Sequence, residues 1–170
     1  MSKGTRFQGN DTARAFTIEA VRTLASLDAI RRLFREYEAS LDVDLAYQDF
    51  ETELAGLPGK YAQPGGELLL ATAADGCPLA CAALRAMPGD GACEIKRLFV
   101  RPEARSMGVG RTLLERLIET ARSRGYREIW LDTLPTMHAA QQLYRRFGFA
   151  QAEAYYETPV AGTVFMRLEL

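Results

Sequence analysis

Residues 93–121 read CEIKRLFVRPEARSMGVGRTLLERLIETA, and they carry the clearest structural pattern of the chain. Its first part, Cys93 to Val100, ends in residues that favour strands. Its last part carries apolar residues at helical spacing, namely Leu113, Leu114, Leu117, Ile118 and Ala121. Between the two parts, Gly108 and Gly110 let the backbone approach a ligand closely. Unpaired N–H groups at a helix start favour an anion, so the stretch predicts a strand, a phosphate-binding turn and a helix.

Two common nucleotide-binding motifs do not fit this turn. A Walker A loop needs Gly-Lys-Ser/Thr, whereas Gly110 is followed by Arg111 and Thr112. A dinucleotide fingerprint needs a third glycine three residues after Gly110, where this chain has Leu113. ATP-dependent and nicotinamide-dependent enzymes are therefore disfavoured.

The flanking sequence alternates between strand and helix patterns in the order β-α-α-β-β-β-α-β-α-β-β. Strands are predicted at residues 16–20, 67–71, 78–86, 93–100, 126–132, 149–156 and 163–170. The first two helices are predicted to begin at the N-caps Ser26 and Asp44, and the last one opens at Pro135. We therefore expect a mixed α/β fold: a central, twisted, mostly antiparallel sheet of about seven strands with four helices.

Length and composition limit the classes of function. At about 150 residues per domain, the 170 residues predict one domain at 15–170, preceded by a polar, flexible tail at 1–14. A net charge of −1 and a pI of about 5.9 argue against a nucleic-acid partner. The apolar runs are far shorter than the roughly 20 residues that span a bilayer, so no membrane partner is expected.

The cysteines and the single histidine argue against a metal site. Cys77, Cys81 and Cys93 are an odd number without a Cys-x-x-Cys pair, and with a single histidine in the chain a zinc site of the usual ligand count is not expected. We interpret all three as small apolar filling on strands. The expected compartment is the reducing cytoplasm, and no metal is predicted.

Charge is distributed unevenly along the chain. Residues 36–53 contain seven acidic residues and no basic one. Residues 96–127 contain nine bases and three acids, a local balance of +6. This distribution indicates either two solvated helical faces or a molecule with one side that attracts a cation and another that holds an anion.

A third pattern fits the turn and extends over most of the chain. The strand EIKRLFV at 94–100 is followed by Arg-x-x-Gly-x-Gly at 105–110. A second block, Ala-x-x-Leu-Tyr-x-x-x-Gly-Phe, lies at 140–149. Together these blocks resemble the GNAT superfamily of acyl-CoA-dependent N-acyltransferases, over about residues 15–170. The resemblance implies that acetyl-CoA is the co-substrate and lies in a cleft where the fourth and fifth strands splay apart.

The resemblance also implies which residues hold acetyl-CoA. Main-chain groups of the strand end would pair with the pantetheine arm, and an N–H near Leu98 would stabilise the developing oxyanion. The amides of 106–111 would bind the pyrophosphate, and Arg105 and Arg111 add positive charge. The predicted binding residues are Leu98, Phe99, Val100, Arg105, Ser106, Met107, Gly108, Val109, Gly110 and Arg111.

Glu94 is the candidate general base, because an amine must lose a proton before it attacks a thioester. Strand alternation places Glu94, Lys96, Leu98 and Val100 on one face, and a carboxylate beside apolar neighbours should have a raised pKa. The histone-acetylating branch of the family has its base glutamate at the same spacing before the loop. The alternative is a solvated strand-end acid that pairs with Lys96 or Arg97.

Tyr144 is the candidate general acid, which would protonate the leaving thiolate. Members of the family often have a tyrosine at this point, and the alternative is a tyrosine that only packs in the core. Many relatives carry Asn where this chain has Met137, so a pantetheine contact there is doubtful or apolar. His138, the only histidine, is expected to be a surface helical residue.

The acidic stretch 36–53, with Tyr37 and Tyr47, is expected to shape the acceptor pocket, and Tyr155 and Tyr156 lie near the last turn. Such an entrance suits a small cationic amine. The predicted function is therefore N-acetyl transfer from acetyl-CoA to a small primary amine. The alternatives are a protein or peptide acetyltransferase and a non-catalytic acyl-CoA-binding module. Dimerisation is common in the family, and the terminal strands are the expected place for it.

Overall fold

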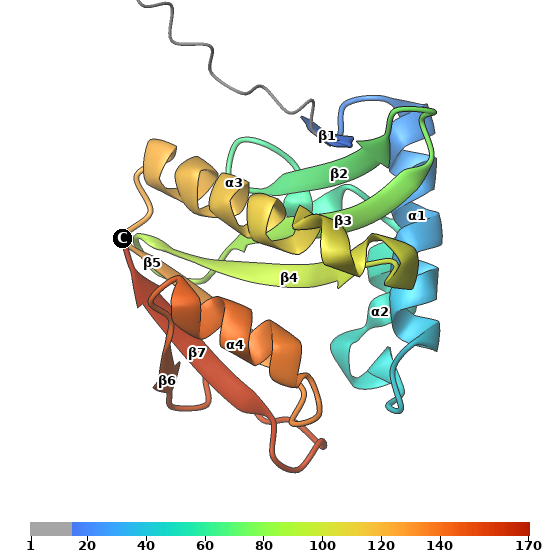
Figure 1. Ribbon diagram of the computed structural model, residues 1–170. Coiled ribbons are helices and arrows are strands. Elements are labelled where there is room, and N and C mark those ends of the chain that lie inside the picture. Colours follow the sequence, from blue (N-terminus) through green and yellow to red (C-terminus); the bar gives the residue numbers. More distant parts are fainter. Residues whose placement is uncertain (1–14) are drawn as a thin grey trace, which may run out of the picture.

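The computed structural model describes residues 15–170. It shows a seven-stranded sheet with helices on both faces (Figure 1). The strands are β1 (Phe16–Ala20), β2 (Glu67–Ala73), β3 (Pro78–Ala86), β4 (Ala92–Val100), β5 (Glu128–Thr133), β6 (Ala150–Ala152) and β7 (Val164–Glu169). The α-helices are α1 (Leu24–Ala39), α2 (Phe50–Ala55), α3 (Val109–Ser123) and α4 (His138–Arg146). Three 3-10 helices lie between them: η1 (Leu45–Gln48), η2 (Gly59–Tyr61) and η3 (Pro102–Met107). The tail predicted for residues 1–14 lies outside the described residues.

The strand order is β1-β2-β3-β4-β5-β7-β6, and the predicted mixed, mostly antiparallel sheet is confirmed. Within it, β4 and β5 are the one parallel pair of neighbours, joined by α3. Their pairing covers only Ala92–Glu94 against Glu128–Trp130. Beyond Glu94 the two strands diverge, so β4 has no strand partner on its β5 side (Figure 1).

A β-bulge interrupts β4 just beyond this point. Between the Cys81–Phe99 and Ala83–Lys96 pairs, one residue of β3 opposes two of β4. One of these two, Arg97, has a φ of 57°, in the left-handed region that L-residues rarely adopt.

The bulge corrects the prediction that Glu94, Lys96, Leu98 and Val100 share one face. Leu98 and Val100 pack with the core on the α3 side, whereas Glu94 and Lys96 lie on the opposite face. The extra residue shifts the alternation by one position, which reverses the side-chain directions that follow.

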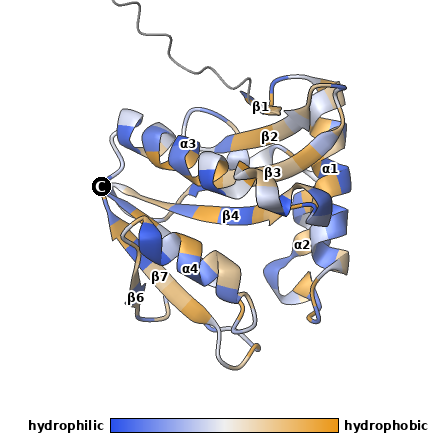
Figure 2. Ribbon diagram, in the orientation of Figure 1, coloured by the Kyte–Doolittle hydropathy of each residue, from blue (hydrophilic) through white to orange (hydrophobic). Residues whose placement is uncertain are grey.

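Two hydrophobic clusters fill the two sides of the sheet. One contains the apolar faces of α3 and α4, and the other contains those of α1 and α2. Figure 2 shows the alternation of hydrophobic and hydrophilic residues along these helices. The central strands are therefore covered on both faces, and the site has to form where the sheet itself opens.

The first two helices begin differently from the prediction. The N-cap of α1 is Thr23, whose hydroxyl accepts the N–H of Ser26, while the Ser26 hydroxyl accepts the N–H of Thr23. Ser26 is thus the third residue of the helix rather than its cap. Asp44 caps the 3-10 helix η1, and Asp49, at a φ of 57°, separates η1 from α2.

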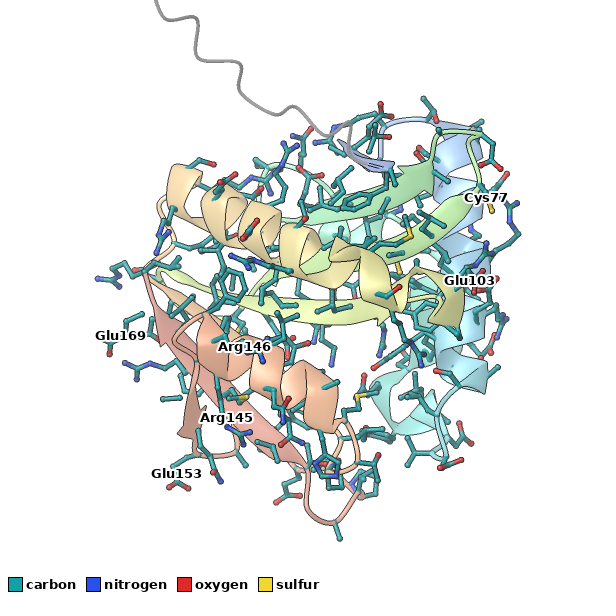
Figure 3. All side chains as sticks on the ribbon, viewed as in Figure 1. Cys77, Glu103, Arg145, Arg146, Glu153 and Glu169 are labelled. Atoms are coloured by element: carbon teal, nitrogen blue, oxygen red, sulfur yellow. The ribbon has the colours of Figure 1, made fainter. Side chains whose placement is uncertain are left out.

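The last predicted strand pair is shorter than expected. Only Ala150–Ala152 of the predicted 149–156 strand pairs with β7, so Tyr155 and Tyr156 lie in the segment that precedes β7. Cys81 and Cys93 are buried on strands as predicted, but Cys77 is exposed in the turn between β2 and β3 (Figure 3).

The residues that the structure describes contain neither a metal-binding cluster nor a membrane-spanning helix. No group of three His, Cys, Asp or Glu side chains among them could hold a metal ion. No helix in the same part of the chain has the length and apolar character needed to cross a bilayer.

Leu117→Ala should lower the free energy of unfolding by about 2–5 kcal/mol, because this fully buried side chain of α3 would leave a cavity in the core. Leu24→Ala is the matched control: Leu24 is 80% exposed at the start of α1, and its change should cost less than about 0.5 kcal/mol. Urea unfolding of both variants checks this, and equal losses would contradict the described core.

Candidate active site

One pocket lies where β4 and β5 diverge, and a second pocket shares three lining residues with it. The first, the inner cleft, has a volume of about 40 Å³ and is lined by Tyr37, Gln48, Ile95, Lys96, Arg97, Leu98, Asp132, Thr133, Met137, Ala140 and Tyr144. The second, the outer pocket, has a volume of about 270 Å³ and is lined by Tyr47, Gln48, Asp49, Glu53, Lys60, Arg85, Lys96, Arg97 and Tyr156. Gln48, Lys96 and Arg97 line both, so these three residues form the boundary between the pockets.

The predicted phosphate-binding turn lies at the end of β4. Gly108 has a φ of 76°, and it precedes α3 without any side-chain cap, so the N–H groups of the first turn keep their hydrogen-bonding capacity. A Cβ atom on Gly110 would lie 3.4 Å from the Val100 side chain, so this part of the turn packs closely against the end of β4. The turn thus has the features of an anion site.

The side chains of the turn differ in their exposure and in their hydrogen bonds. Val109 is buried in the core, so only its backbone could face a ligand, whereas Met107 is half-buried and packs against that core. Ser106 is exposed. Arg105 Nε donates to the Val100 carbonyl at 3.3 Å, and the exposed Arg111 pairs with Glu115 at 3.0 Å.

The predicted pantetheine strand has a free main-chain edge. Phe99 and Val100 pair with β3 on one side only, and Leu98 lies in the bulge, since β5 departs after Glu94. The bulge at Arg97 lies beside Leu98, where the resemblance places the oxyanion donor. An extended ligand could add to this edge as a further strand.

Glu94 is buried rather than solvated, with a relative exposure of 2%. Its Oε1 accepts from Arg85 Nε at 2.7 Å, and its Oε2 accepts the hydroxyl of Tyr155. Its partners are therefore neither Lys96 nor Arg97, and it lines neither pocket.

Tyr144 lines the inner cleft and is 6% exposed. Its ring packs against Phe149 at a centroid distance of 5.7 Å, and its hydroxyl donates to no residue among those described. Burial, with smaller contributions from Tyr37 and Asp132, raises the pKa of Tyr144. The hydroxyl therefore stays protonated at neutral pH and is free to donate into the cleft.

The sequence did not single out Asp132, Lys96 or Tyr156 as a group. Asp132 Oδ1 accepts from Lys96 Nζ at 3.1 Å, and its Oδ2 accepts the Tyr156 hydroxyl at 2.8 Å. The one available signal was that Asp132 ends a predicted strand next to the splay.

Arginines neutralise most of the acidic stretch 36–53. Four of its seven acids are in ion pairs: Glu36 with Arg101, Glu38 and Glu51 with Arg35, and Glu53 with Arg97. The stretch therefore presents much less free negative charge than its composition predicts. Two of its tyrosines do reach the site, since Tyr37 lines the inner cleft and Tyr47 the outer pocket.

Met137 and His138 lie at the start of α4, where the chain departs from the family pattern. Met137 lines the inner cleft, where its sulfur accepts the Thr133 hydroxyl at 3.6 Å. His138 is exposed, as expected of a surface residue.

Comparisons with known proteins agree with this geometry. The family model for the acetyltransferase (GNAT) family matches residues 27–149. An uncharacterised N-acetyltransferase of Schizosaccharomyces pombe is 40% identical over 154 residues, covering 91% of this chain and 94% of that protein. An N-acetylaspartate synthetase of Rattus norvegicus is 28% identical over 86% of this chain and 50% of its own length.

Solved structures share the fold. A GNAT acetyltransferase of Staphylococcus aureus superposes with a TM-score of 0.76 at 19% identity, over 91% of this chain and 99% of that one. An acetyltransferase of Salmonella typhimurium, determined with acetyl-CoA, gives 0.70 at 22% identity, over 91% and 94%. The family match, the 40% identical relative and the splayed site together show that the chain belongs to the GNAT family and is an N-acetyltransferase.

Proposed function

We propose that this protein moves an acetyl group from acetyl-CoA to the primary amine of a small molecule. The observation that carries the proposal is the junction of two pockets at Lys96 and Arg97. The inner cleft lies between the diverging strands, and the outer pocket opens beside α2. A thioester in the first and an amine in the second would meet at this boundary.

Acetyl-CoA is proposed to bind along the free edge of β4 and at the start of α3. The backbone of Leu98, Phe99 and Val100 would pair with the pantetheine arm, and the amides of 106–111 would receive the pyrophosphate. The uncapped helix start and the left-handed Gly108 support this arrangement.

Glu94 is proposed to act as the general base through a relay. Both of its oxygens are held, so the acceptor ammonium would give its proton to the Tyr155 hydroxyl as Tyr155 passes its own proton to Glu94. The neutral nitrogen then bonds to the thioester carbon, the C–S bond breaks, and the nitrogen loses its second proton, which replaces the one that Tyr144 gives to the sulfur. The Tyr144 hydroxyl protonates the departing sulfur, and the cleft-facing position of this side chain supports that role.

The acceptor is proposed to be small and to carry charges of both signs. A volume of about 270 Å³ holds a small molecule more readily than a folded protein surface. The pocket walls carry Lys60 and Arg85 as well as Asp49 and Glu53. Since arginines neutralise much of the acidic stretch, a purely cationic amine is less favoured than an amine with an acid group. The name of the Rattus norvegicus relative, an N-acetylaspartate synthetase, makes aspartate the first candidate.

Purified protein should release free CoA from acetyl-CoA with at least one amine of a panel comprising L-aspartate, L-glutamate, putrescine, tryptamine and a short lysine peptide. A thiol reagent detects the release, and mass spectrometry identifies the acetylated product. Turnover with the lysine peptide alone would contradict the small-molecule acceptor. No turnover with any amine would contradict the proposed function.

Arg105→Ala should weaken CoA binding by about fivefold, which corresponds to about 1 kcal/mol for one exposed charge contact to the pyrophosphate. Arg122→Ala, at the far end of α3, is the control and should bind CoA as the wild type does. Calorimetric titration with CoA and with pantetheine tests the site, because pantetheine lacks the pyrophosphate. An equal loss for both ligands would contradict the assignment of Arg105.

Glu94→Gln and Tyr144→Phe should each lower kcat by about 10²- to 10⁴-fold with little change in the KM for acetyl-CoA, because each removes a proton-transfer group. Glu67→Gln is the matched control for Glu94. It is an equally buried carboxylate held by two arginines, Arg22 and Arg124, away from the cleft. Tyr126→Phe is the control for Tyr144. Steady-state rates that fall as much in the controls would show a structural effect only.

A further inference from the structure

Asp132 is the carboxylate of the inner cleft, and its partners connect it to the outer pocket. It lines the inner cleft, its partner Tyr156 lines the outer pocket, and its partner Lys96 lines both. The side chains of Lys96 and Asp132 are 7% and 9% exposed, so the pair is nearly desolvated. Since Lys96 lines both pockets, the pair lies next to their boundary.

The negative charge of Asp132 contributes to raised pKa values of tyrosines on several elements around the cleft. Burial raises the pKa of Tyr37 to about 12, and Asp132 adds to that rise. Burial followed by Asp132 raises the pKa of Tyr156, and Asp132 also contributes to the rise at Tyr144. These tyrosines belong to α1, α4 and the segment before β7. The Asp132 carboxylate therefore acts on side chains from three parts of the chain.

Asp132 keeps hydrogen-bonding capacity within the inner cleft. Each oxygen of Asp132 accepts one donor, whereas a carboxylate has about four lone-pair sites. Glu94 is closed off by Arg85 and Tyr155 and faces neither pocket. Of these two carboxylates, Asp132 is thus the one that an acceptor could touch directly.

We propose that Asp132 binds the amino group of the acceptor as an ammonium ion beside Lys96, and that Lys96 favours its conversion to the neutral amine. Two ammonium groups on one buried carboxylate repel each other, and this repulsion lowers the pKa of the incoming one. Asp132 therefore selects amines, and Lys96 eases the loss of the proton that travels to Glu94. This assignment rests on the proposed acetyl transfer.

Other charged and titratable groups near Lys96 and Asp132 could also affect how the rate depends on pH. The charged and titratable neighbours are Tyr37 from α1, Glu53 from α2, Arg85 from β3, Glu94 and Arg97 from β4, Tyr144 from α4, and Tyr155 and Tyr156 before β7. The arginines are ion-paired with Glu53 and Glu94. The pKa values of the four tyrosines are raised, so these side chains stay neutral between pH 6 and 9. A shift of the rate profile in this range would report the acceptor amine.

Asp132→Asn should raise the KM for L-aspartate, or for the amine of the panel that turns over fastest, by tenfold or more. The KM for acetyl-CoA should change less than twofold. Lys96→Met should shift the pH profile of kcat upward by about one unit, because kcat reports the bound amine. A structural role alone would not move that profile.

A double variant keeps the test valid if Asp132→Asn fails to fold, since that change leaves Lys96 buried without its partner. Lys96→Met with Asp132→Asn removes both charges and should fold, while its acceptor KM stays raised tenfold. An acceptor KM within twofold of the wild type, in the single or the double variant, overturns the role of Asp132. An unshifted profile in Lys96→Met overturns the role of Lys96. Failure of the wild type to turn over any amine would instead contradict the proposed function itself.

Discussion

β4 and β5 stop pairing after Glu94 and Trp130, and the site depends on this early separation. Parallel strands joined by a helix normally continue side by side, since each unpaired N–H or C=O group costs free energy when it is buried. Here the separation leaves the β4 edge free and opens the inner cleft between the strands. The bulge at Arg97 follows directly, and it sends Leu98 and Val100 to the α3 side. One interruption of the ladder thus creates both the edge and the cleft.

The same interruption places polar side chains in the middle of the molecule. Glu94, Lys96 and Arg97 of β4 are all buried, and each pairs with a different element: Arg85 on β3, Asp132 on β5 and Glu53 on α2. Buried ion pairs recover their desolvation cost only with good geometry, and the loss of one partner leaves an uncompensated charge. The three pairs therefore hold α2, β3 and β5 in fixed positions around the open end of the sheet.

Much of the fold could be predicted because its signals are local. The strand, turn and helix of 93–121, the hairpins and the amphipathic helices follow from periodicity and glycine placement, and the structure confirms them. The bulge could not be predicted, because nothing in the residue types around Arg97 marks an extra residue. The ion pairs that neutralise the acidic stretch could not be predicted either, because Arg35, Arg97 and Arg101 approach it only in the folded chain. Asp132 was missed for the same reason: its partners lie 36 and 24 residues away.

The aromatic cluster before β7 has a practical consequence. Trp130 is the only tryptophan of the chain, and its ring lies 5.5 Å from that of Tyr155, edge to face. Tyr155 in turn contacts Tyr156 and Phe165 and donates to Glu94. The single indole thus borders Tyr155, which holds Glu94 and contacts Tyr156, the partner of Asp132. Its emission spectrum is a built-in optical signal for any rearrangement of that segment, with no label attached.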